Sequence, residues 1–204
     1  MLIVEIGWVK RVGMVSTEHW YVWDGREDRF VPVERPPQDP KIVEVLQHLK
    51  IRLATVNDRQ KLFDFRREAF ESELEIWLPD ELDLNEIRKN VDEWKPSKYP
   101  NDFIIVAELN GEIIGFLHLT ICYRLFNGGP SAWVEDLFVL KKFRGYKVGT
   151  KLMEFAKEIA RKRGCKTLRL IVGLENLAGL RFYEHCGFRI IKVGLATMKL
   201  NNSK

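Results

Sequence analysis

The stretch FVLKKFRGYKVGTKLM, residues 138–153, is the strongest local signal in the sequence. It begins as an apolar strand, passes through a basic loop and continues as an amphipathic helix. Gly145 and Gly149 let the backbone approach a ligand closely, and a helix N-terminus offers unpaired N–H groups and the positive end of the helix dipole. The stretch therefore predicts a phosphate-binding turn, with an ordinary strand–helix connection as the alternative.

The spacing of this loop departs from the two common nucleotide-binding motifs. The P-loop requires four residues between its glycines followed by Lys-Ser or Lys-Thr, which the residues after Gly145 do not provide. The dinucleotide fingerprint GxGxxG does not occur in the loop either. Arg144, Lys147 and Lys151 nevertheless make the loop and the helix start positive, which favours an anionic ligand of another kind.

Working outward from this stretch, residues 51–204 alternate between strand and helix patterns. Asn110-Gly111 joins two apolar segments and is the strongest short hairpin signal, and Thr55 with Asp58 predicts a capped helix start. The expected strands are 51–56, 102–109, 112–122, 131–140, 167–172, 188–193 and 195–200, and the expected helices are 55–73, 83–94, 150–164 and 176–184. This order predicts one layered α+β domain.

The first fifty residues have the pattern of an appendage. A proline-rich segment, ERPPQDP at 34–40, predicts an extended linker, and a short helix is expected after it. Segments rich in β-branched and aromatic residues predict short strands at 2–9, 19–23 and 29–33. No catalytic pattern is found there. The predicted division is a β-rich appendage and linker at 1–50 and a second domain at 51–204.

Composition narrows the class of protein. The chain has 204 residues, of which 46% are apolar and 30% charged, the balance of a soluble globular protein. No run approaches the roughly 18–20 apolar residues that a membrane span needs, and the first residues lack the features of a secretory signal. Three widely spaced cysteines predict neither a disulfide framework nor a metal site, and a reducing cytoplasm is the simplest interpretation.

Net charge says less than its distribution. The formal charge of +4 is too small for a dedicated nucleic-acid-binding protein. Acidic residues dominate between Asp64 and Glu93, whereas basic residues dominate between Lys141 and Lys166. Two solvated helix faces would explain this pattern. The alternative is one region that attracts cations and another that attracts anions.

Three motifs resemble those of the GCN5-related N-acetyltransferase (GNAT) superfamily. The loop RGYKVG, 144–149, is similar to the family's acetyl-CoA loop Arg/Gln-x-x-Gly-x-Gly/Ala, except that Lys147 stands where the first family glycine usually lies. This departure raises the question of whether the backbone of Lys147 keeps a negative φ, which most lysines can adopt. WVEDLFV, 133–139, resembles the strand before that loop, and NLAGLRFYEHCGF, 176–188, resembles the family helix that follows.

The resemblance implies a fold and a role for each motif. The fold is α+β, a GNAT-like mixed and mostly antiparallel central sheet with helices on both faces, beside the small β-rich appendage. The backbone of Leu137, Phe138 and Val139 would pair with the pantetheine arm of acetyl-CoA. Asn176 would hydrogen-bond the same arm. The amides that would cradle the pyrophosphate are those of Arg144, Gly145, Tyr146, Lys147, Val148, Gly149 and Thr150.

The chemistry of amine acetylation needs a proton acceptor and a proton donor. A lysine-like amine has a pKa of about 10.4, so about one molecule in 10³ is a free nucleophile at pH 7, and a carboxylate can take its proton. Glu135 is the predicted acceptor, with a solvent-facing or lysine-paired side chain as the alternative. Asp136 should point to the other face. Tyr183 would protonate the leaving thiolate, unless it is a core tyrosine, and a strand N–H near Phe138 would meet the oxyanion.

Other side chains are weaker candidates. Cys186 is expected to be a buried apolar residue rather than an acyl carrier. His118 is expected to be a satisfied core histidine rather than part of the acceptor pocket, and His185 lies one position off the face of the tyrosine. The acidic stretch 71–86 falls where the family builds its acceptor site, so a cationic acceptor is a hypothesis. No metal is expected.

Together these features predict an acetyl-CoA-dependent N-acetyltransferase that transfers acetyl directly to a primary amine in a ternary complex. The strand motif resembles the polyamine and small-amine branch, whereas the 176–188 block suits branches that acetylate protein N-termini equally well. The alternatives are a non-catalytic acyl-CoA-binding module and a nucleotide-phosphate enzyme. The expected partners are acetyl-CoA and an amine, with no nucleic acid or membrane, and a homodimer is compatible with the sequence.

Overall fold

The structure, a computed structural model, describes residues 20–24, 29–33, 39–73, 84–124 and 128–196. The chain divides into two compact units, Met1–Gln47 and His48–Lys204. The predicted boundary after residue 50 lies close to this division. That the two parts are separate domains stays a prediction.

The first unit contains an antiparallel hairpin of β1 (Trp20–Asp24) and β2 (Arg29–Val33), in which Trp20 pairs with Val33. These strands match the two expected at 19–23 and 29–33. Helix α1 (Pro40–His48) also begins where the sequence predicts it. The strand expected at 2–9 lies outside the described residues.

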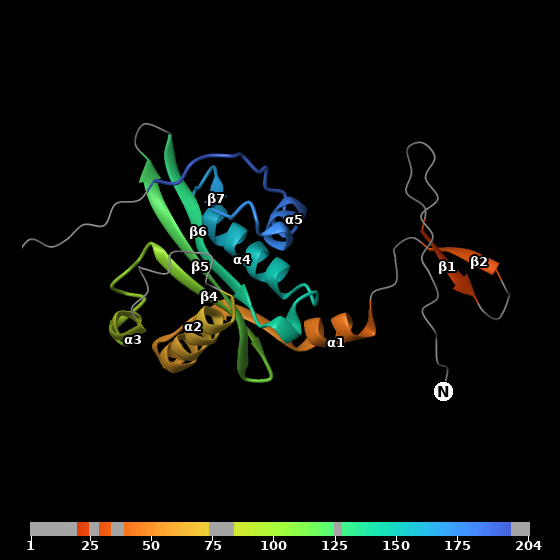
Figure 1. The fold of residues 1–204 in the computed structure, drawn as a ribbon, viewed down its shortest axis with the longest axis horizontal. Helices are drawn as coiled ribbons and strands as arrows, with labels where there is room; N and C mark the ends of the chain where they lie inside the picture. Colours follow the sequence, from red (N-terminus) through yellow and green to blue (C-terminus); the bar gives the residue numbers. More distant parts are fainter. Residues whose placement is uncertain (1–19, 25–28, 34–38, 74–83, 125–127, 197–204) are drawn as a thin grey trace, which may run out of the picture. The chain divides into compact units, whose positions relative to one another are not determined.

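The second unit is built on a five-stranded sheet in the order β3-β4-β5-β6-β7 (Figure 1). Its strands are β3 (Leu49–Leu53), β4 (Asp102–Leu109), β5 (Glu112–Arg124), β6 (Gly129–Val139) and β7 (Leu168–Leu170). The first three pairings are antiparallel, and only β6 and β7 run parallel. The expected α+β class, with a mixed and mostly antiparallel sheet, is therefore confirmed.

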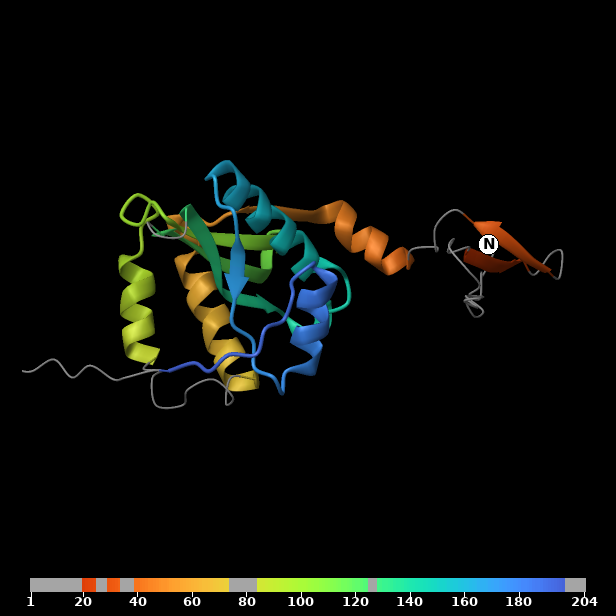
Figure 2. The same ribbon diagram turned by 90° about the horizontal axis from the view of Figure 1, so that it is seen from above.

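Helices cover both faces of this sheet. Figures 1 and 2 show α2 (Arg59–Glu73) and α3 (Leu84–Glu93) on one side and α4 (Val148–Lys162) on the other, with α5 (Leu177–His185) beside α4. On the α2 side, the ring of Phe65 packs edge-on against Phe116 and Phe138, at 5.6 and 5.2 Å between centroids. On the α4 side, Leu152 and Met153 are fully buried.

The start of α2 is held by a buried ion-pair network. Asp58 accepts hydrogen bonds from the backbone N–H of Thr55 at 2.8 Å and from Arg52 Nη1 at 2.8 Å, and Arg52 also donates to Glu108. The predicted Thr55–Asp58 cap is present, formed around a short 3-10 turn at Val56–Asp58. The bond from Arg52 lowers the pKa of Asp58 to about 2, because its effect outweighs the opposing effect of burial.

We expect the change Asp58→Asn to destabilise the fold by about 2 kcal/mol at pH 7, since a pKa unit corresponds to about 1.4 kcal/mol. The folded-state pKa is depressed from 3.8 to about 2. The stabilisation is therefore complete above the unfolded pKa and is lost as the pH falls from about 4 to 2.

Urea unfolding of both proteins at pH 7 and pH 3 measures this difference, with Asp64→Asn at an exposed i,i+3 pair as the matched control. Equal free energies of unfolding for Asp58→Asn and the wild type at pH 7 would show that the network contributes nothing.

The C-terminal part differs from the sequence expectation. Residues 188–196 are described but form no strand, although 188–193 was predicted to be one. Strand-forming residues need a neighbouring strand to pair with, and Ile191 and Val193 here lie 62% and 81% exposed. The expected strand at 195–200 lies mostly outside the described residues. Among the described helices, none is long and apolar enough to cross a membrane.

Candidate active site

The sheet opens at its β6–β7 junction. These strands pair only from Ala132 with Leu168 to Val134 with Leu170. Beyond this point β6 continues to Val139 while the segment after Leu170 leaves the sheet, so within the described chain one edge of Leu137–Val139 has no strand beside it. Unpaired backbone N–H and C=O groups at such an edge can bind an extended ligand as an added strand.

A pocket of about 540 Å³ lies against this open edge. It is lined by residues 137–139, 143–145 and 147–150, and by side chains from α5 that include Asn176 and Tyr183. The structure thus brings together in one cavity nearly all the residues that the sequence motifs singled out. Tyr146 and Glu135 are the predicted site residues outside the lining.

Residues that the sequence reading missed also line this pocket. They are Phe143 from the loop and Ala178, Gly179, Phe182 and His185 from α5. The helical spacing of 178, 179, 182 and 185 was a signal that could have found the last four, because positions three and four apart share one helix face. His185 was placed off the face of Tyr183, yet both residues line the cavity.

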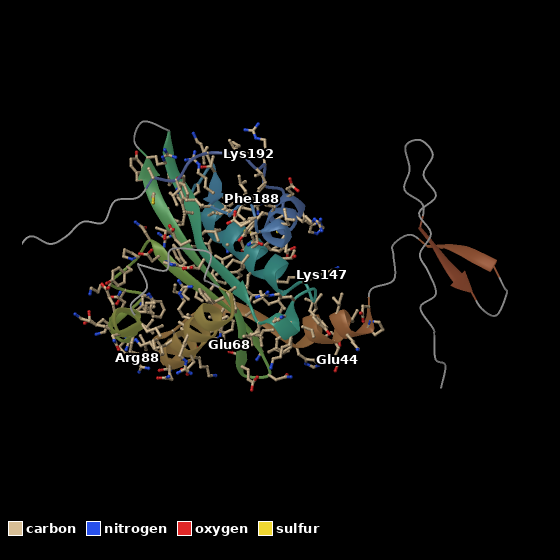
Figure 3. All side chains as sticks on the ribbon, in the orientation of Figure 1. Glu44, Glu68, Arg88, Lys147, Phe188 and Lys192 are labelled. Carbon is tan, nitrogen blue, oxygen red and sulfur yellow. The ribbon has the colours of Figure 1, made fainter. Side chains whose placement is uncertain are left out.

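The loop enters α4 through two left-handed residues. Gly145 has φ 85° and Lys147 has φ 62°, so the backbone of Lys147 does not keep the negative φ that most lysines adopt. The chain must reverse direction between the short 3-10 turn at Lys141–Phe143 and the start of α4, and a left-handed residue makes that turn. Figure 3 shows Lys147 at the N-terminal end of α4.

The first turn of α4 presents free amides to the pocket. The first helical hydrogen bond runs from the N–H of Lys151 to the carbonyl of Lys147, so the amides of Val148, Gly149 and Thr150 have no partner within the helix. All three residues line the cavity. Three convergent N–H groups at the positive end of a helix can bind a phosphate.

Because a lysine at positive φ is strained by roughly 1–2 kcal/mol, Lys147→Gly is expected to stabilise the fold by about 0.5–1 kcal/mol after the entropic cost of glycine. Urea unfolding measures the change. Lys151→Gly, in the same helix turn but at ordinary helical φ, is the matched control and should destabilise by up to about 1 kcal/mol. Destabilisation of similar size in both variants would show that Lys147 is not strained.

Helix α5 forms the opposite wall. The side chain of Asn176 accepts a hydrogen bond of 2.8 Å from the N–H of Gly179 and so caps α5, in addition to lining the pocket. The ring of Phe182 lies so close to Gly149 that a Cβ there would stand 3.3 Å from it. A side chain at the second glycine of the loop would therefore be in tight contact with α5.

Tyr183 is half-buried between two aromatic rings, with centroids 5.2 Å from Phe182 and 5.9 Å from Phe188. Burial raises its pKa to about 12, and the charges of Cys186 and Asp136 act in the same direction. The side chain is therefore a neutral phenol at physiological pH. A phenol in this position can donate a proton or a hydrogen bond into the pocket.

A β-bulge divides β6 at the point where the site begins. His118 pairs with Asp136 but Leu119 pairs with Val134, so Glu135 has no partner residue on β5. The extra residue shifts the alternation of side chains, because the period of two holds on either side of a bulge but not across it. Glu135 is exposed, whereas Asp136 is half-buried and lies against His118. Simple alternation from the sequence could not reveal this shift.

His118 lies between two carboxylates. Its Nδ1 is 3.7 Å from Asp136 Oδ2, and its Nε2 is 3.4 Å from Asp102 Oδ1. Burial disfavours the charged imidazole, but the interactions with Asp136 and Asp102 outweigh it, so the pKa of His118 lies above its ordinary value of 6.5. The pKa of Asp136 is lowered, because its interaction with His118 and the charge of Arg66 outweigh its own burial.

With this geometry in view, comparison with known proteins places the chain in a class. The acetyltransferase (GNAT) family model matches residues 60–188, which is more than half of the chain. The chain belongs to the acetyltransferase (GNAT) family.

Particular relatives agree with this assignment. An uncharacterized N-acetyltransferase of Archaeoglobus fulgidus is 40% identical over 96 residues, which cover 47% of this chain and 65% of that relative. The match therefore leaves about a third of that relative uncovered. The spermidine N(1)-acetyltransferase of Thermoplasma acidophilum is 25% identical over 156 residues, covering 70% of this chain and 89% of the relative.

Solved structures share the fold. The aminoglycoside N-acetyltransferase AAC(6')-Iy in complex with CoA superimposes with a TM-score of 0.62 at 19% identity, covering 74% of this chain and 95% of that one.

Proposed function

We propose that the chain is an acetyl-CoA-dependent N-acetyltransferase that transfers the acetyl group directly to a primary amine in a ternary complex. The observation that carries this proposal is the convergence of three features on one cavity. The open edge of β6 at Leu137–Val139, the first amides of α4 and the phenol of Tyr183 all line it. A pantetheine arm, a pyrophosphate and a reacting thioester need these three features in one cavity.

The residues present fit acetyl-CoA. The open β6 edge offers backbone groups to the amides of the pantetheine arm, as an added strand would use them. The amides of Val148, Gly149 and Thr150 suit the pyrophosphate. Because Gly149 has no side chain, the space between these amides and Phe182 stays open. The basic residues of the loop, Lys141, Lys142 and Lys147, are exposed and add attraction for an anion.

The proton inventory assigns two roles to the protein. An ammonium acceptor loses two protons as its nitrogen forms the amide bond and the C–S bond breaks. One proton goes to the CoA sulfur through the phenol of Tyr183, which its pKa of about 12 keeps protonated and which takes a proton from the nitrogen in return. The other must leave through a base on the amine side. Strand β6 carries two carboxylates just before its open edge, those of Glu135 and Asp136. Glu135, the proton acceptor expected from the sequence, remains a prediction.

The nature of the acceptor is part of the proposal. The relative from Thermoplasma acidophilum is named for spermidine and the structural neighbour for aminoglycosides, and both are polycationic amines. The acidic stretch 71–86 is consistent with such an acceptor, although residues 74–83 lie outside the described part of the chain. A cationic primary amine is therefore the acceptor class that we propose.

A panel of amines tests enzyme status and acceptor class together. Purified full-length chain is incubated with acetyl-CoA and spermidine, an aminoglycoside, a peptide with an internal lysine or a peptide with a free N-terminus, and free CoA is measured. Release that depends on an amine and is fastest with a polycation supports the proposal.

Acetyl-CoA that binds but is not consumed with any amine would favour a non-catalytic acyl-CoA-binding module instead. ATP is added in a further arm. Competition by ATP as strong as that by CoA would favour a nucleotide-phosphate enzyme.

A further inference from the structure

The cluster around His118 joins three strands and a helix. Its members are Asp102 from β4, His118 from β5, Asp136 from β6 and Arg66 from α2. The Nη1 atom of Arg66 lies 3.9 Å from Asp136 Oδ1. Thr120 Oγ1 donates to Asp102 Oδ1 at 3.0 Å and fixes that carboxylate. A neutral histidine in a core is satisfied by one acceptor and one donor, whereas this imidazole has a carboxylate, which only accepts, near each nitrogen.

The cluster opens toward the gap in the sheet. Asp136 immediately precedes Leu137, which lines the cofactor pocket. It lies two residues after Val134, where the pairing of β6 with β7 ends. Its charge also contributes to the raised pKa of Tyr183, which lines that pocket. The side chains of Asp136 and His118 are 40% and 28% exposed, so a small molecule can reach them. They therefore lie on the α2 side of the same gap whose other side is the cofactor pocket.

We propose that Asp136 and His118 form the proton-accepting pair of the acceptor site, with Asp136 meeting the amine and His118 acting as the positioning residue behind it. This inference rests on the proposed function and deepens it. The bulge at Glu135 is what turns Asp136 toward His118 and α2.

The tautomer of His118 follows from its partners. The neutral imidazole has one N–H, and the shorter contact, Nε2 to Asp102 at 3.4 Å, places that hydrogen on Nε2. The lone pair of Nδ1 then faces Asp136. A proton leaving the ammonium group passes to the Asp136 carboxylate and on to Nδ1, which gives an imidazolium between two carboxylates. Solvent receives that proton afterwards, and the freed amine attacks the acetyl carbon.

Other uses of the cluster are less consistent with it. Among the described residues, no three His, Cys, Asp or Glu side chains are arranged to hold a metal ion, and this cluster is no exception. The charged or titratable groups that the described elements direct at the pair are Asp102, Arg66 and Tyr183. The positive charge of Arg66 offsets one of the two carboxylates, so the cluster accepts one proton without accumulating charge.

The test compares Asp136→Asn, His118→Gln and Glu135→Gln with the wild type, using acetyl-CoA and the fastest amine of the panel. We expect kcat to fall on the order of 100-fold in Asp136→Asn and about 10-fold in His118→Gln, with a smaller fall in Glu135→Gln. The KM for the amine should change less than the kcat. His48→Gln, at an exposed histidine away from the sheet gap, is the matched control and should behave as the wild type.

The pH profile separates a positioning role from a structural one. A base must be neutral to accept a proton, so the kcat of the wild type should rise with pH through the raised pKa of His118, above 6.5. In Asp136→Asn one of the two carboxylates that raise this pKa is gone, while Asp102 and burial remain, so the rise should move to lower pH. In His118→Gln the rise should vanish.

Two results would overturn the proposed role of Asp136 and His118. One is an unshifted pH profile in His118→Gln, and the other is a larger loss of kcat in Glu135→Gln than in Asp136→Asn.

If His118→Gln fails to bind acetyl-CoA, the His118 imidazole is titrated by NMR in the wild type and in Asp136→Asn. An unchanged pKa of His118 in Asp136→Asn would overturn the proposed role, and a lower pKa would support it. Acetylation of no amine by the wild type would overturn the proposed function, and the pair's role with it.

Discussion

Replacing Tyr183 by Phe is expected to lower kcat on the order of 100-fold while leaving the Kd for acetyl-CoA within about threefold of the wild type. The substitution removes one oxygen and keeps the ring that packs between Phe182 and Phe188. The leaving thiolate of CoA has a parent thiol pKa near 8.5, so it benefits from a proton donor as the C–S bond breaks. With a pKa of about 12, Tyr183 carries that proton at physiological pH.

The measurements are steady-state kinetics at saturating acetyl-CoA and calorimetric titration of acetyl-CoA in the absence of an amine. Tyr99→Phe, at a partly exposed tyrosine before β4, is the control for removing a phenol and should leave both quantities unchanged. A kcat of Tyr183→Phe equal to that of the wild type would make Tyr183 a packing residue of α5, the alternative that its sequence context allowed.

Replacing Gly149 by Val is expected to raise the Kd for acetyl-CoA about 100-fold or more, which corresponds to a loss of roughly 3 kcal/mol. A Cβ at this position would lie 3.3 Å from the ring of Phe182 and 3.8 Å from Val139 Cγ2, and a branched side chain would occupy the space before the first amides of α4. Ala, which adds one carbon, should raise the Kd about 10-fold. Its higher helix propensity should at the same time keep the fold as stable as the wild type or make it slightly more stable.

The combination of lost affinity and retained stability in Gly149→Ala is what identifies a binding role. Calorimetric titration and urea unfolding of the same preparations measure the two quantities. Gly194→Ala, at a glycine with no atom within 4 Å of an added Cβ, is the control. If Gly149→Ala loses stability and affinity in parallel, the glycine is needed only for packing α4 against α5.

The features that could be predicted from the sequence are those set by local chemistry. Asn110-Gly111 forms the expected hairpin between β4 and β5, and both residues adopt the positive φ, 51° and 85°, that this turn requires. Thr55 and Asp58 form the cap that their spacing predicts, around the 3-10 turn that leads into α2. The loop at 144–150 joins β6 to α4 as its pattern of apolar and basic residues indicates, because a strand, a turn and a helix each have a short-range signature.

The features that could not be predicted depend on pairing between distant strands. The bulge that directs Asp136 toward His118 exists only in the register of β5 against β6, and no residue of β6 marks it. Alternation alone therefore places Asp136 on the face opposite Glu135, whereas Glu135, exposed and outside the pocket lining, stays a prediction as the proton acceptor. The positive φ of Lys147 likewise follows from where α4 must start against the sheet, which residue preferences alone do not encode.

The central claim is that this pocket transfers an acetyl group from acetyl-CoA directly to an amine. A single-turnover reaction, with the chain in excess over acetyl-CoA and with spermidine present, tests it when the amine and the intact protein are both followed by mass spectrometry. The account predicts one N-acetyl group on spermidine for each acetyl-CoA consumed and an unchanged protein mass. Acetyl-CoA recovered intact from a stable complex, or an acetyl group found on the protein, would contradict it.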